Sequence, residues 1–420
     1  MRTYKQIGKG YVILLEEGRE RYMETAERTY VKHTREHGQL IPKSKWIQHV
    51  VEQFIPGYGI ETLDFPQILK ILDLRGEAGE LILVGNNRRL RCGKLSIETV
   101  GSLILDAVAA GIDERASRWK PKFVVVMRWA NKPSDSVDVM VCQGRPEYNG
   151  ATFQVASNAH CIETTSPEQA PNEELLPVIM DTDPTQGAFA GIGCPSTLFA
   201  KLAPFADPRK PKNEWLQTKE RHINVLENLC KWLSDGNGYP IVNSADAAAS
   251  ISERQAFDVS VGLLRDVPPI YTGVVNGDML RVNLNTRQRV NHVYCTALNR
   301  DQNFGRVNTE RDPEERITAT LLRGAYLGTL LCAEKCKSEK CVLTMLGGGS
   351  FCNDWDTIAD AIVHAMQMMG HIMPRQGSVK EIRLCIFDLL QTAKNGVERL
   401  RTLERLVRKL KDCGFDAEMQ

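Results

Sequence analysis

Apolar positions recur along the chain at two spacings, one typical of buried strands and one typical of amphipathic helices. Short apolar runs predict strands at 81–85, 123–127, 137–142, 151–158, 341–346 and 382–386, and one long strand or two within 281–298. Apolar residues at helical spacing predict helices at 16–37, 46–55, 97–110, 213–233, 317–334, 358–365 and 397–410. Strands that alternate with helices are typical of an α/β fold with parallel strands.

The alternation of strands and helices is continuous from about residue 137 to 390. It predicts one α/β domain at 131–420 and a mainly helical extension at 1–130 that packs on this domain. Within the extension, two strands and the helix between them, at 81–127, predict a parallel unit.

Composition narrows the functional classes. The chain has 420 residues, an ordinary apolar content and a net charge of +1, which does not support a general binder of nucleic acids or membrane surfaces. No apolar run reaches the roughly eighteen residues of a transmembrane helix. The N-terminal residues also lack the apolar core of a signal peptide. The leucine stripe at 397–410 is expected to face the core or a partner rather than a membrane.

Cysteine usage points to a reducing compartment. The 12 cysteines stand mostly within apolar runs, which predicts reduced, buried thiols and a cytoplasmic protein. Cys332, Cys336 and Cys341 lie close in sequence, but no matching Cys or His pair stands nearby. Their spacing therefore fits no usual zinc site. We expect neither a metal nor a cofactor, with magnesium at the acid-rich segment 299–315 as the alternative.

Three consecutive glycines follow the strand predicted at 341–346, and a helical segment follows the glycines. This order suits an anion, because glycines let backbone N–H groups approach a phosphate and a helix N-terminus adds partial positive charge. A second turn of small residues, at 181–193, also permits close approach of the backbone. Glycine runs are also common in ordinary tight turns, so the loop by itself leaves both interpretations open.

Four segments occur together in this order: FQVASN at 153–158, DPTQGA at 183–188, VYCTAL at 293–298 and LTMLGGGSFCN at 343–353. A further segment, AYLGTLL at 325–331, lies in a predicted helix. The set resembles the motifs F-Q-V-A-S, D-x-T-Q-G, C-[ST]-A-L, A-Y-x-x-T-L-L and L-x-x-L-G-G-G-x-F-x-N of a divergent macrodomain family. The resemblance covers about residues 137–370.

The resemblance implies a three-layer α/β/α macrodomain-like fold with a mixed sheet that binds ADP-ribose. It also implies a hydrolase that cleaves an N-glycosidic bond and so removes ADP-ribose from arginine side chains of proteins. The implied partners are ADP-ribose and ADP-ribosylated protein, without nucleic acid or membrane. The two glycine-bearing loops would hold the diphosphate from both sides, which agrees with the N–H groups that such loops offer.

The same resemblance implies a set of ligand-binding residues at the two loops and after the strand at 153–158. They are Asn158, Asp183, Thr185, Gln186, Gly187, Ala188, Gly347, Gly348, Gly349, Ser350, Phe351 and Asn353. Several have structural alternatives. Phe351 can belong to the core, Asp183 and Asn353 can cap helices, and His160 is expected to be structural or exposed rather than a catalytic base. Glu163 stands with Asn158 just after a buried strand, where ligand-facing residues of open α/β sheets gather.

Cleavage of the ribosyl bond requires a carboxylate. The transition state resembles an oxocarbenium ion, and a carboxylate can stabilise its charge, orient a water molecule or hold the arginine cation. The polar segment at 299–315 is rich in acids and leads into a buried helix. Asp301, Glu310 and Asp312 are therefore the expected catalytic residues. A solvated connection between two elements is the alternative for each of them.

Three other functional classes remain as alternatives. The first is a module that binds ADP-ribose without cleaving it. The second is a doubly wound nucleotide-binding protein or transferase, but neither glycine turn matches G-x-G-x-x-G or G-x-x-x-x-G-K-[ST]. The third is a cysteine hydrolase that uses Cys161, Cys295 or Cys352. Cysteines inside strands are typically inert, which disfavours this class.

Overall fold

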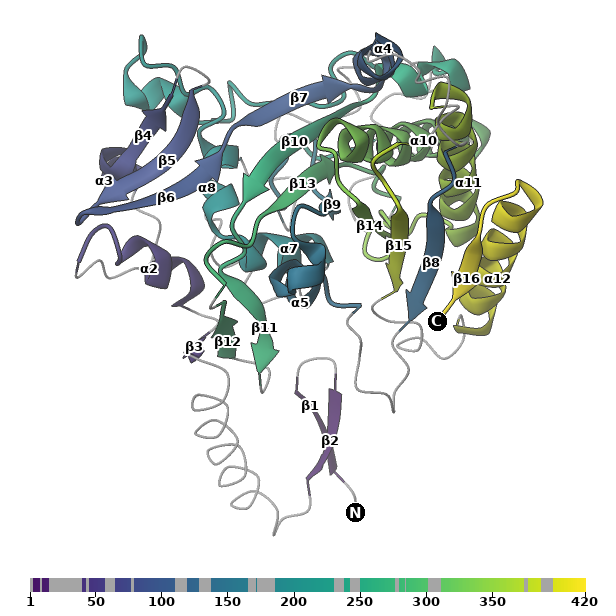
Figure 1. The fold of residues 1–420 in the computed structure, drawn as a ribbon, viewed down its shortest axis with the longest axis horizontal. Coiled ribbons are helices and arrows are strands. Elements are labelled where there is room, and N and C mark those ends of the chain that lie inside the picture. Colours follow the sequence, from purple (N-terminus) through teal and green to yellow (C-terminus); the bar gives the residue numbers. More distant parts are fainter. Residues whose placement is uncertain are drawn as a thin grey trace.

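The computed structural model describes residues 3–7, 10–14, 40–42, 45–56, 65–76, 79–109, 119–127, 137–164, 171, 186–229, 238–241, 250–275, 279–283, 285–300, 311–373, 377–386 and 396–420. At its centre is an eight-stranded sheet (Figure 1). The strands lie in the order β16 (Ala417–Met419), β8 (Lys122–Met127), β15 (Glu381–Ile386), β14 (Lys340–Thr344), β9 (Thr152–Ala156), β13 (Val290–Cys295), β10 (Ser260–Val267) and β7 (Leu95–Thr99). Neighbours from β16 to β13 are parallel, whereas β10 is antiparallel to both β13 and β7. The predicted mixed sheet is confirmed.

Helices cover both faces of this sheet. Successive side chains of a strand point to opposite faces, and β13 shows both. Cys295 Sγ lies 3.7 Å from the carbonyl oxygen of Ala325, whereas the Tyr294 ring centroid lies 4.7 Å from Lys201 Nζ. One face carries α10 (Arg311–Lys335), α11 (Trp355–Ile372), α12 (Gly396–Asp412) and α4 (Val100–Ala109). The other carries α5 (Val139–Gly144), α7 (Gln186–Gly193) and α8 (Ser196–Leu202). The predicted three-layer α/β/α arrangement is therefore confirmed.

Smaller antiparallel sheets lie beside the central one. One contains β4 (Leu72–Arg75), β5 (Glu80–Gly85) and β6 (Arg88–Gly93), and another contains β11 (Tyr271–Val275), β12 (Met279–Val282) and β3 (Leu40–Pro42). Strands β1 (Thr3–Ile7) and β2 (Gly10–Leu14) form a hairpin, and α2 (Trp46–Val51) and α3 (Phe65–Ile71) are short helices. The parallel unit predicted at 81–127 is wrong, because β5 folds back onto β6 through Asn86 and Asn87. Both asparagines have positive φ, at 46° and 56°, as a tight hairpin turn requires.

The central sheet crosses the boundary predicted at residue 130. Strand β7 pairs with β10 at one edge, and β8 lies between β15 and β16. Both β7 and β8 come from the predicted extension at 1–130, yet they complete the sheet of the predicted domain at 131–420. The division into two domains stays a prediction, and the sheet is continuous across it.

The helix predicted at 213–233 is wrong over its described part. Only Lys212–Trp215 is helical there, as a short 3₁₀ turn, and turns and extended backbone follow. The backbone N–H groups of this segment bond elsewhere: Ile223 N donates to Gln217 Oε1 at 2.7 Å and Val225 N donates to Ala159 O at 2.9 Å. Tertiary hydrogen bonds therefore replace the helical ladder that the apolar spacing predicts.

The strand predicted at 137–142 is also wrong, because this segment forms α5. Asp138 caps the helix, since its Oδ1 accepts hydrogen bonds from Met140 N at 2.8 Å and from Val141 N at 3.4 Å. A short apolar run can belong to a buried helix as well as to a strand, and here the cap decides.

The other described elements agree with the apolar pattern. Predicted strands at 81–85, 123–127, 151–158, 341–346 and 382–386 are β5, β8, β9, β14 and β15, and 281–298 contains part of β12 and all of β13. Predicted helices at 46–55, 97–110, 317–334, 358–365 and 397–410 are α2, α4, α10, α11 and α12, with shifted ends. The helix predicted at 16–37 lies outside the described residues.

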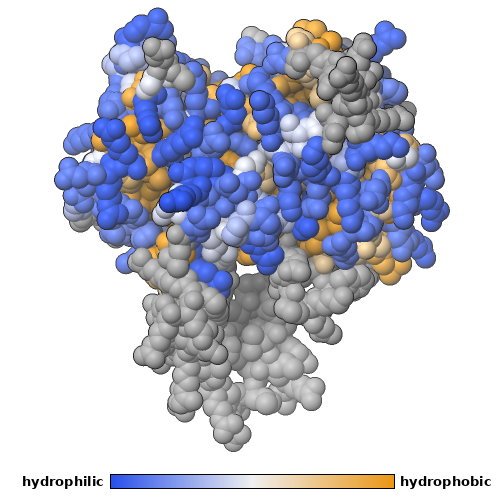
Figure 2. Space-filling view, in the orientation of Figure 1, coloured by the Kyte–Doolittle hydropathy of each residue, from blue (hydrophilic) through white to orange (hydrophobic). Residues whose placement is uncertain are grey.

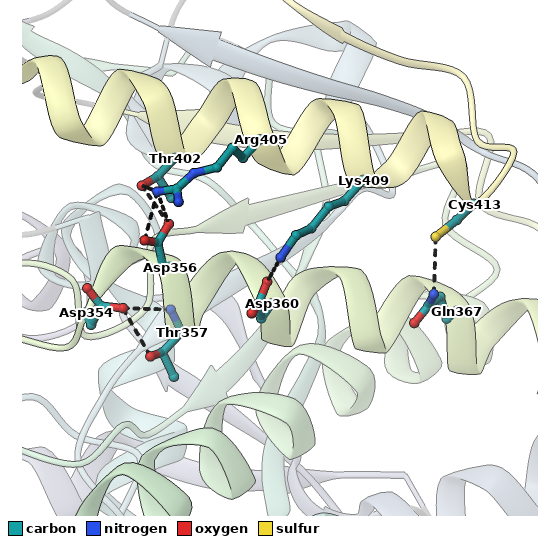
Figure 3. A network of polar contacts seen from close by, with 9 residues as sticks. All are labelled: Asp354, Asp356, Thr357, Asp360, Gln367, Thr402, Arg405, Lys409 and Cys413. Atoms are coloured by element: carbon teal, nitrogen blue, oxygen red, sulfur yellow. Dashed lines mark hydrogen bonds and ion pairs between the residues drawn. The ribbon is translucent and has the colours of Figure 1, made fainter. Parts of the chain in front are cut away.

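Helix α12 places its leucine stripe in the core. Leu403, Leu406 and Leu410 are buried, so the expectation that this stripe faces the core is confirmed. Charged residues on the flank of the stripe join α12 to α11 (Figure 3): Arg405 pairs with Asp356, and Lys409 pairs with Asp360. Exposed ion pairs of this kind contribute little to stability each, so burial of the leucines holds most of this interface.

Hydrophilic residues cover most of the face shown in Figure 2, and an apolar patch lies over α4 at its top. On α4, Leu105 and Val108 are exposed, with relative exposures of 72% and 56%. No helix within the described ranges is long and apolar enough to span a membrane.

Candidate functional site

Three loops meet at one edge of the central sheet. Strands β14, β9 and β13 are parallel neighbours, so the segments that follow them, at 345–354, 157–164 and 296–300, leave the sheet at the same edge. Hydrogen bonds join the loops: Ser157 N donates to Cys295 O at 2.9 Å, and Arg300 N donates to Phe351 O at 2.9 Å. Ligands of open α/β sheets bind at this edge, beyond the carboxyl ends of the strands.

The backbone of the glycine loop after β14 is held by hydrogen bonds, and several of its N–H groups donate to no described residue. Gly347 has a φ of +73°, which glycine adopts readily. Gly348 N donates to Met345 O at 2.9 Å, and Asn353 N donates to Gly347 O at 3.0 Å. The backbone N–H groups of Gly347, Gly349, Ser350 and Phe351 donate no hydrogen bond to any residue that the structure describes. These four donors stand just before the N-terminus of α11, so the loop is suited to an anion.

Gly348 and Gly349 differ in the space that surrounds them. A Cβ atom on Gly348 would lie 3.0 Å from Ile358 Cδ1 and 3.1 Å from Trp355 Nε1, so a side chain has little room. A Cβ atom on Gly349 would meet nothing within 4 Å, and its φ is not positive. Packing therefore explains Gly348 but not Gly349, and the space beside Gly349 is open to a ligand.

Asn353 holds the loop in shape. Its Nδ2 donates to Leu298 O at 2.9 Å and to Gly347 O at 3.1 Å. The alternative that Asn353 caps the following helix is wrong, because Asp354 is the cap and accepts from Thr357 N at 2.9 Å (Figure 3). The predicted contact of Asn353 with ribose stays a prediction.

Aromatic rings line the loop on two sides. The ring centroids of Phe351 and Tyr239 lie 5.5 Å apart, with 58° between the planes. Trp355 Nε1 donates to Gly348 O at 3.1 Å, and the guanidinium carbon of Arg399 lies 4.8 Å from the Trp355 ring centroid. Phe351 is half-buried, so its ring has contact with the interior and also remains partly accessible.

The second predicted loop begins α7 beside the end of β9. A Cβ atom on Gly187 would overlap the carbonyl oxygen of Ala156, so the helix starts in direct contact with that strand end. Strands β9 and β14 are neighbours, and both small-residue bends therefore lie at the same edge of the sheet. Asp183 and Thr185 lie outside the described residues. Gln186 and Ala188 belong to α7, but their side chains are not described.

Asn158 lies inside the loop that follows β9. It is 2% exposed, and its Nδ2 donates to Thr164 Oγ1 at 2.6 Å. His160 is fully buried and its Nδ1 accepts from Ile162 N at 3.2 Å, so the expectation of a structural histidine is confirmed. Contact between Asn158 and a ligand stays a prediction.

The predicted catalytic carboxylates have only partial placement. Asp301 and Glu310 lie outside the described residues, and Asp312 belongs to the first turn of α10, without a described side chain. Glu314, from the same segment, is 3% exposed and pairs with Arg300 at 3.2 Å. Since Arg300 N also donates to Phe351 O, Arg300 links the start of α10 to the glycine loop.

Burial makes two of the candidate cysteines poor nucleophiles. Desolvation raises the pKa of Cys161 and of Cys295 to about 12, so both thiols are protonated at neutral pH. Thiolates, not thiols, attack substrates. A cysteine hydrolase that uses either residue is therefore disfavoured. Cys352 is exposed, in a left-handed conformation with a φ of +53°.

A lysine is buried on α8. Lys201 is 8% exposed, and its burial lowers its pKa to about 8, although the negative charge of Glu163 opposes this shift. Lys201 also adds to the effect of burial on His292, whose pKa falls to about 3. The sequence pattern had not indicated this cluster, because a lysine on an apolar helix gives no sign of which strand it will face.

Lys201 makes the stability of the fold depend on pH. Its pKa is about 8 in the fold and 10.5 ordinarily, so between these values the unfolded chain binds more protons and stability rises with pH. We expect the unfolding free energy of the wild type, minus that of Lys201→Met, to rise by about 3 kcal/mol between those two values. Urea unfolding of both proteins at several pH values measures this difference.

The comparison with Lys201→Met is needed because other buried groups lower the stability of the fold as the pH rises. The raised pKa values of Cys161 and Cys295 remove stability as the pH rises through the ordinary range of a thiol. Both proteins share that contribution, so it cancels. A difference that stays constant with pH would contradict the prediction.

Within the described ranges, no group of three or more His, Cys, Asp or Glu residues is arranged to hold a metal ion. Of the three clustered cysteines, Cys332 and Cys341 are buried and Cys336 is half-buried.

Tyr326, from the AYLGTLL segment, supports the glycine loop from α10. Its hydroxyl donates to Thr344 O at 2.7 Å and accepts from Leu346 N at 3.1 Å. It thereby satisfies two backbone groups at the point where β14 ends and the loop begins. Sequence reasoning assigned this tyrosine no role, and only the motif around it indicated that the position mattered.

No family model matches the chain, and neither does any curated protein. Solved structures of poly(ADP-ribose) glycohydrolase are partly similar. A single-site mutant of the enzyme from Deinococcus radiodurans, in complex with ADP-ribose, has a TM-score of 0.43 and 14% identity, over 74% of this chain and 95% of that one. The enzyme from Thermomonospora curvata has a TM-score of 0.43 and 13% identity, over 86% and 98%. The same enzyme bound to the inhibitor ADP-HPD has a TM-score of 0.42. Scores and identities this low describe a partial similarity of structure and do not bear on the activity of this chain.

Proposed function

We propose that the chain is a hydrolase that removes ADP-ribose from modified protein side chains, with arginine-linked mono-ADP-ribose as the substrate. The observation that supports this most is the glycine loop. Four of its backbone N–H groups donate to no described residue, and they stand before the N-terminus of α11 with open space at Gly349. Such a loop suits a diphosphate.

The second bend supplies the opposite side of the proposed diphosphate site. Helix α7 begins at the end of β9, next to the strand that carries the glycine loop. Its N-terminus adds partial positive charge. The proposal keeps Asp183, Thr185, Gln186, Gly187 and Ala188 as ligand-binding residues on this side.

The proposed ribose site lies beside Phe351, toward the acid-rich start of α10. The ion pair between Arg300 and Glu314 ties that helix to the glycine loop. Asp301, Glu310 and Asp312 remain the proposed catalytic carboxylates, and each would stabilise positive charge on the ribose or orient a water molecule. We further propose a cytoplasmic protein whose partners are ADP-ribosylated proteins.

Release of ADP-ribose from defined substrates tests this proposal. The purified chain is incubated with proteins modified at arginine, serine or glutamate, and free ADP-ribose is measured. We expect release from the arginine-linked substrate above the other two. Asp301→Asn, Glu310→Gln and Asp312→Asn are assayed in parallel, and at least one is expected to reduce turnover while calorimetry shows unchanged ADP-ribose binding.

Two results would overturn the proposal in different ways. Binding of ADP-ribose without release from any substrate would favour a module that recognises the ligand and does not cleave it. Absence of ADP-ribose binding would exclude both the hydrolase and the module that only recognises the ligand.

A further inference from the structure

Glu163 lies between the end of β9 and the start of α7. Its Oε2 lies 2.9 Å from the position that a Cβ atom would take on Gly187, so the carboxylate is in contact with the first turn of α7. Glu163 is half-buried. It therefore stands at the edge of the sheet where the glycine loop also emerges, beside the second bend of the proposed diphosphate site.

The loop that carries Glu163 is fixed by hydrogen bonds to neighbouring segments. Ala159 N donates to Gly238 O at 2.8 Å, Val225 N donates to Ala159 O at 2.9 Å, and Ser157 N donates to Cys295 O at 2.9 Å. Asn158 N closes the loop by donating to Ile162 O at 3.1 Å. A carboxylate on so constrained a backbone is held in place before any substrate arrives, which lowers the entropic cost of reaction.

A basic side chain is buried near Glu163. Lys201, on α8, is buried, and the negative charge of Glu163 opposes the fall in the pKa of Lys201 that burial causes. A carboxylate near a buried cation can also stabilise a second positive charge that forms only during the reaction. The positive charge that develops on ribose during cleavage is such a cation.

Another described acid near the glycine loop is less available. The carboxylate of Glu314 is 4% exposed and engaged with Arg300 at 3.2 Å. Glu163 differs in being half-buried, in the loop that follows β9, and β9 is the neighbour of the strand that carries the glycine loop.

We propose that Glu163 is a catalytic carboxylate of this chain, facing the ribosyl bond that is cleaved. This inference rests on the proposed function. Glu163 takes a proton from a water molecule as the water oxygen bonds to the anomeric carbon. The bond from that carbon to the arginine nitrogen breaks, and its electron pair stays on the nitrogen. The carboxylic acid then returns the proton to the nitrogen, so that one water is consumed and Glu163 is regenerated.

Glu163→Gln tests the role, since it keeps the shape of the side chain and removes the charge. We expect kcat for ADP-ribose release to fall by about 100-fold or more, with ADP-ribose affinity unchanged in calorimetry. The acidic limb of the pH profile of kcat should also disappear, which a merely structural role would not cause. Glu214→Gln, an exposed change outside the proposed site, is the matched control and should leave kcat unchanged.

The outcomes separate this inference from the proposed function. A wild type that neither binds nor releases ADP-ribose would overturn both. A wild type that turns over while Glu163→Gln keeps full kcat and the same pH profile would overturn the role of Glu163 alone. If Glu163→Gln fails to fold, Glu163→Asp decides, because it keeps the charge but withdraws it by one methylene. A folded Asp variant with wild-type kcat would contradict the inference, and a folded one with reduced kcat and intact binding would support it.

Discussion

Gly349→Asp is expected to bind ADP-ribose about 30-fold more weakly than Gly349→Asn. A Cβ atom at this position would meet nothing within 4 Å and the φ of Gly349 is not positive, so both variants should fold as the wild type does. The two side chains have nearly the same shape and differ in charge. The aspartate would place a negative charge beside N–H groups that we propose bind a diphosphate, and the repulsion between like charges lowers affinity.

Titration calorimetry of the two variants with ADP-ribose measures this difference, and thermal unfolding confirms that both are folded. At higher salt the difference in ADP-ribose affinity between the two variants should become smaller, because salt screens the repulsion between exposed charges. Equal affinities would show that the diphosphate does not lie near Gly349. That result would count against the proposed site even if the chain binds the nucleotide elsewhere.

Gly347→Ala is expected to lower the free energy of unfolding by about 3 kcal/mol. The φ of +73° at this position disfavours any side chain, and a Cβ atom there would overlap Asn353 Nδ2 and lie 2.8 Å from Ala297 Cβ. Asn353 would have to move, and its hydrogen bonds to Leu298 O and Gly347 O would be lost.

Urea unfolding measures the effect, and Gly349→Ala is the matched control from the same loop. The control adds the same methyl group where φ is not positive and space is open, so its stability should stay close to that of the wild type. Equal stability of Gly347→Ala and Gly349→Ala would contradict the described shape of the loop.

The sequence predicted best those elements whose apolar pattern and local signals agree. Helices α10 and α11 and strands β9, β14 and β15 follow from local periodicity. The segment at 213–229 was wrongly predicted as a helix. Its apolar spacing is helical, but its backbone N–H groups donate to acceptors outside a helical ladder, such as the Gln217 side chain and Ala159 O. The α5 segment was wrongly predicted as a strand. Its composition is typical of a strand, but the N-cap at Asp138 favours the helix that forms.

The site was predictable where chemistry is local and not where it depends on packing. The glycine loop could be found from its residues, because close approach to an anion needs glycine wherever the loop lies. Contacts such as Tyr239 with Phe351, or Arg399 with Trp355, join residues distant in sequence, and no local pattern indicates them. For the same reason Glu163 could be placed after a strand, but its contact with α7 and its lysine neighbour could not be foreseen.

The position of β8 has a consequence for how the chain acquires its structure. This strand lies between β15 and β16, and both of these partners come from the far end of the sequence, whereas β8 comes from the first third. During synthesis β8 therefore emerges long before either partner exists. Its apolar residues must remain unpaired in the meantime, and contacts so distant in sequence slow folding. We expect newly made chains to depend on chaperones until the segment that contains β15 has left the ribosome.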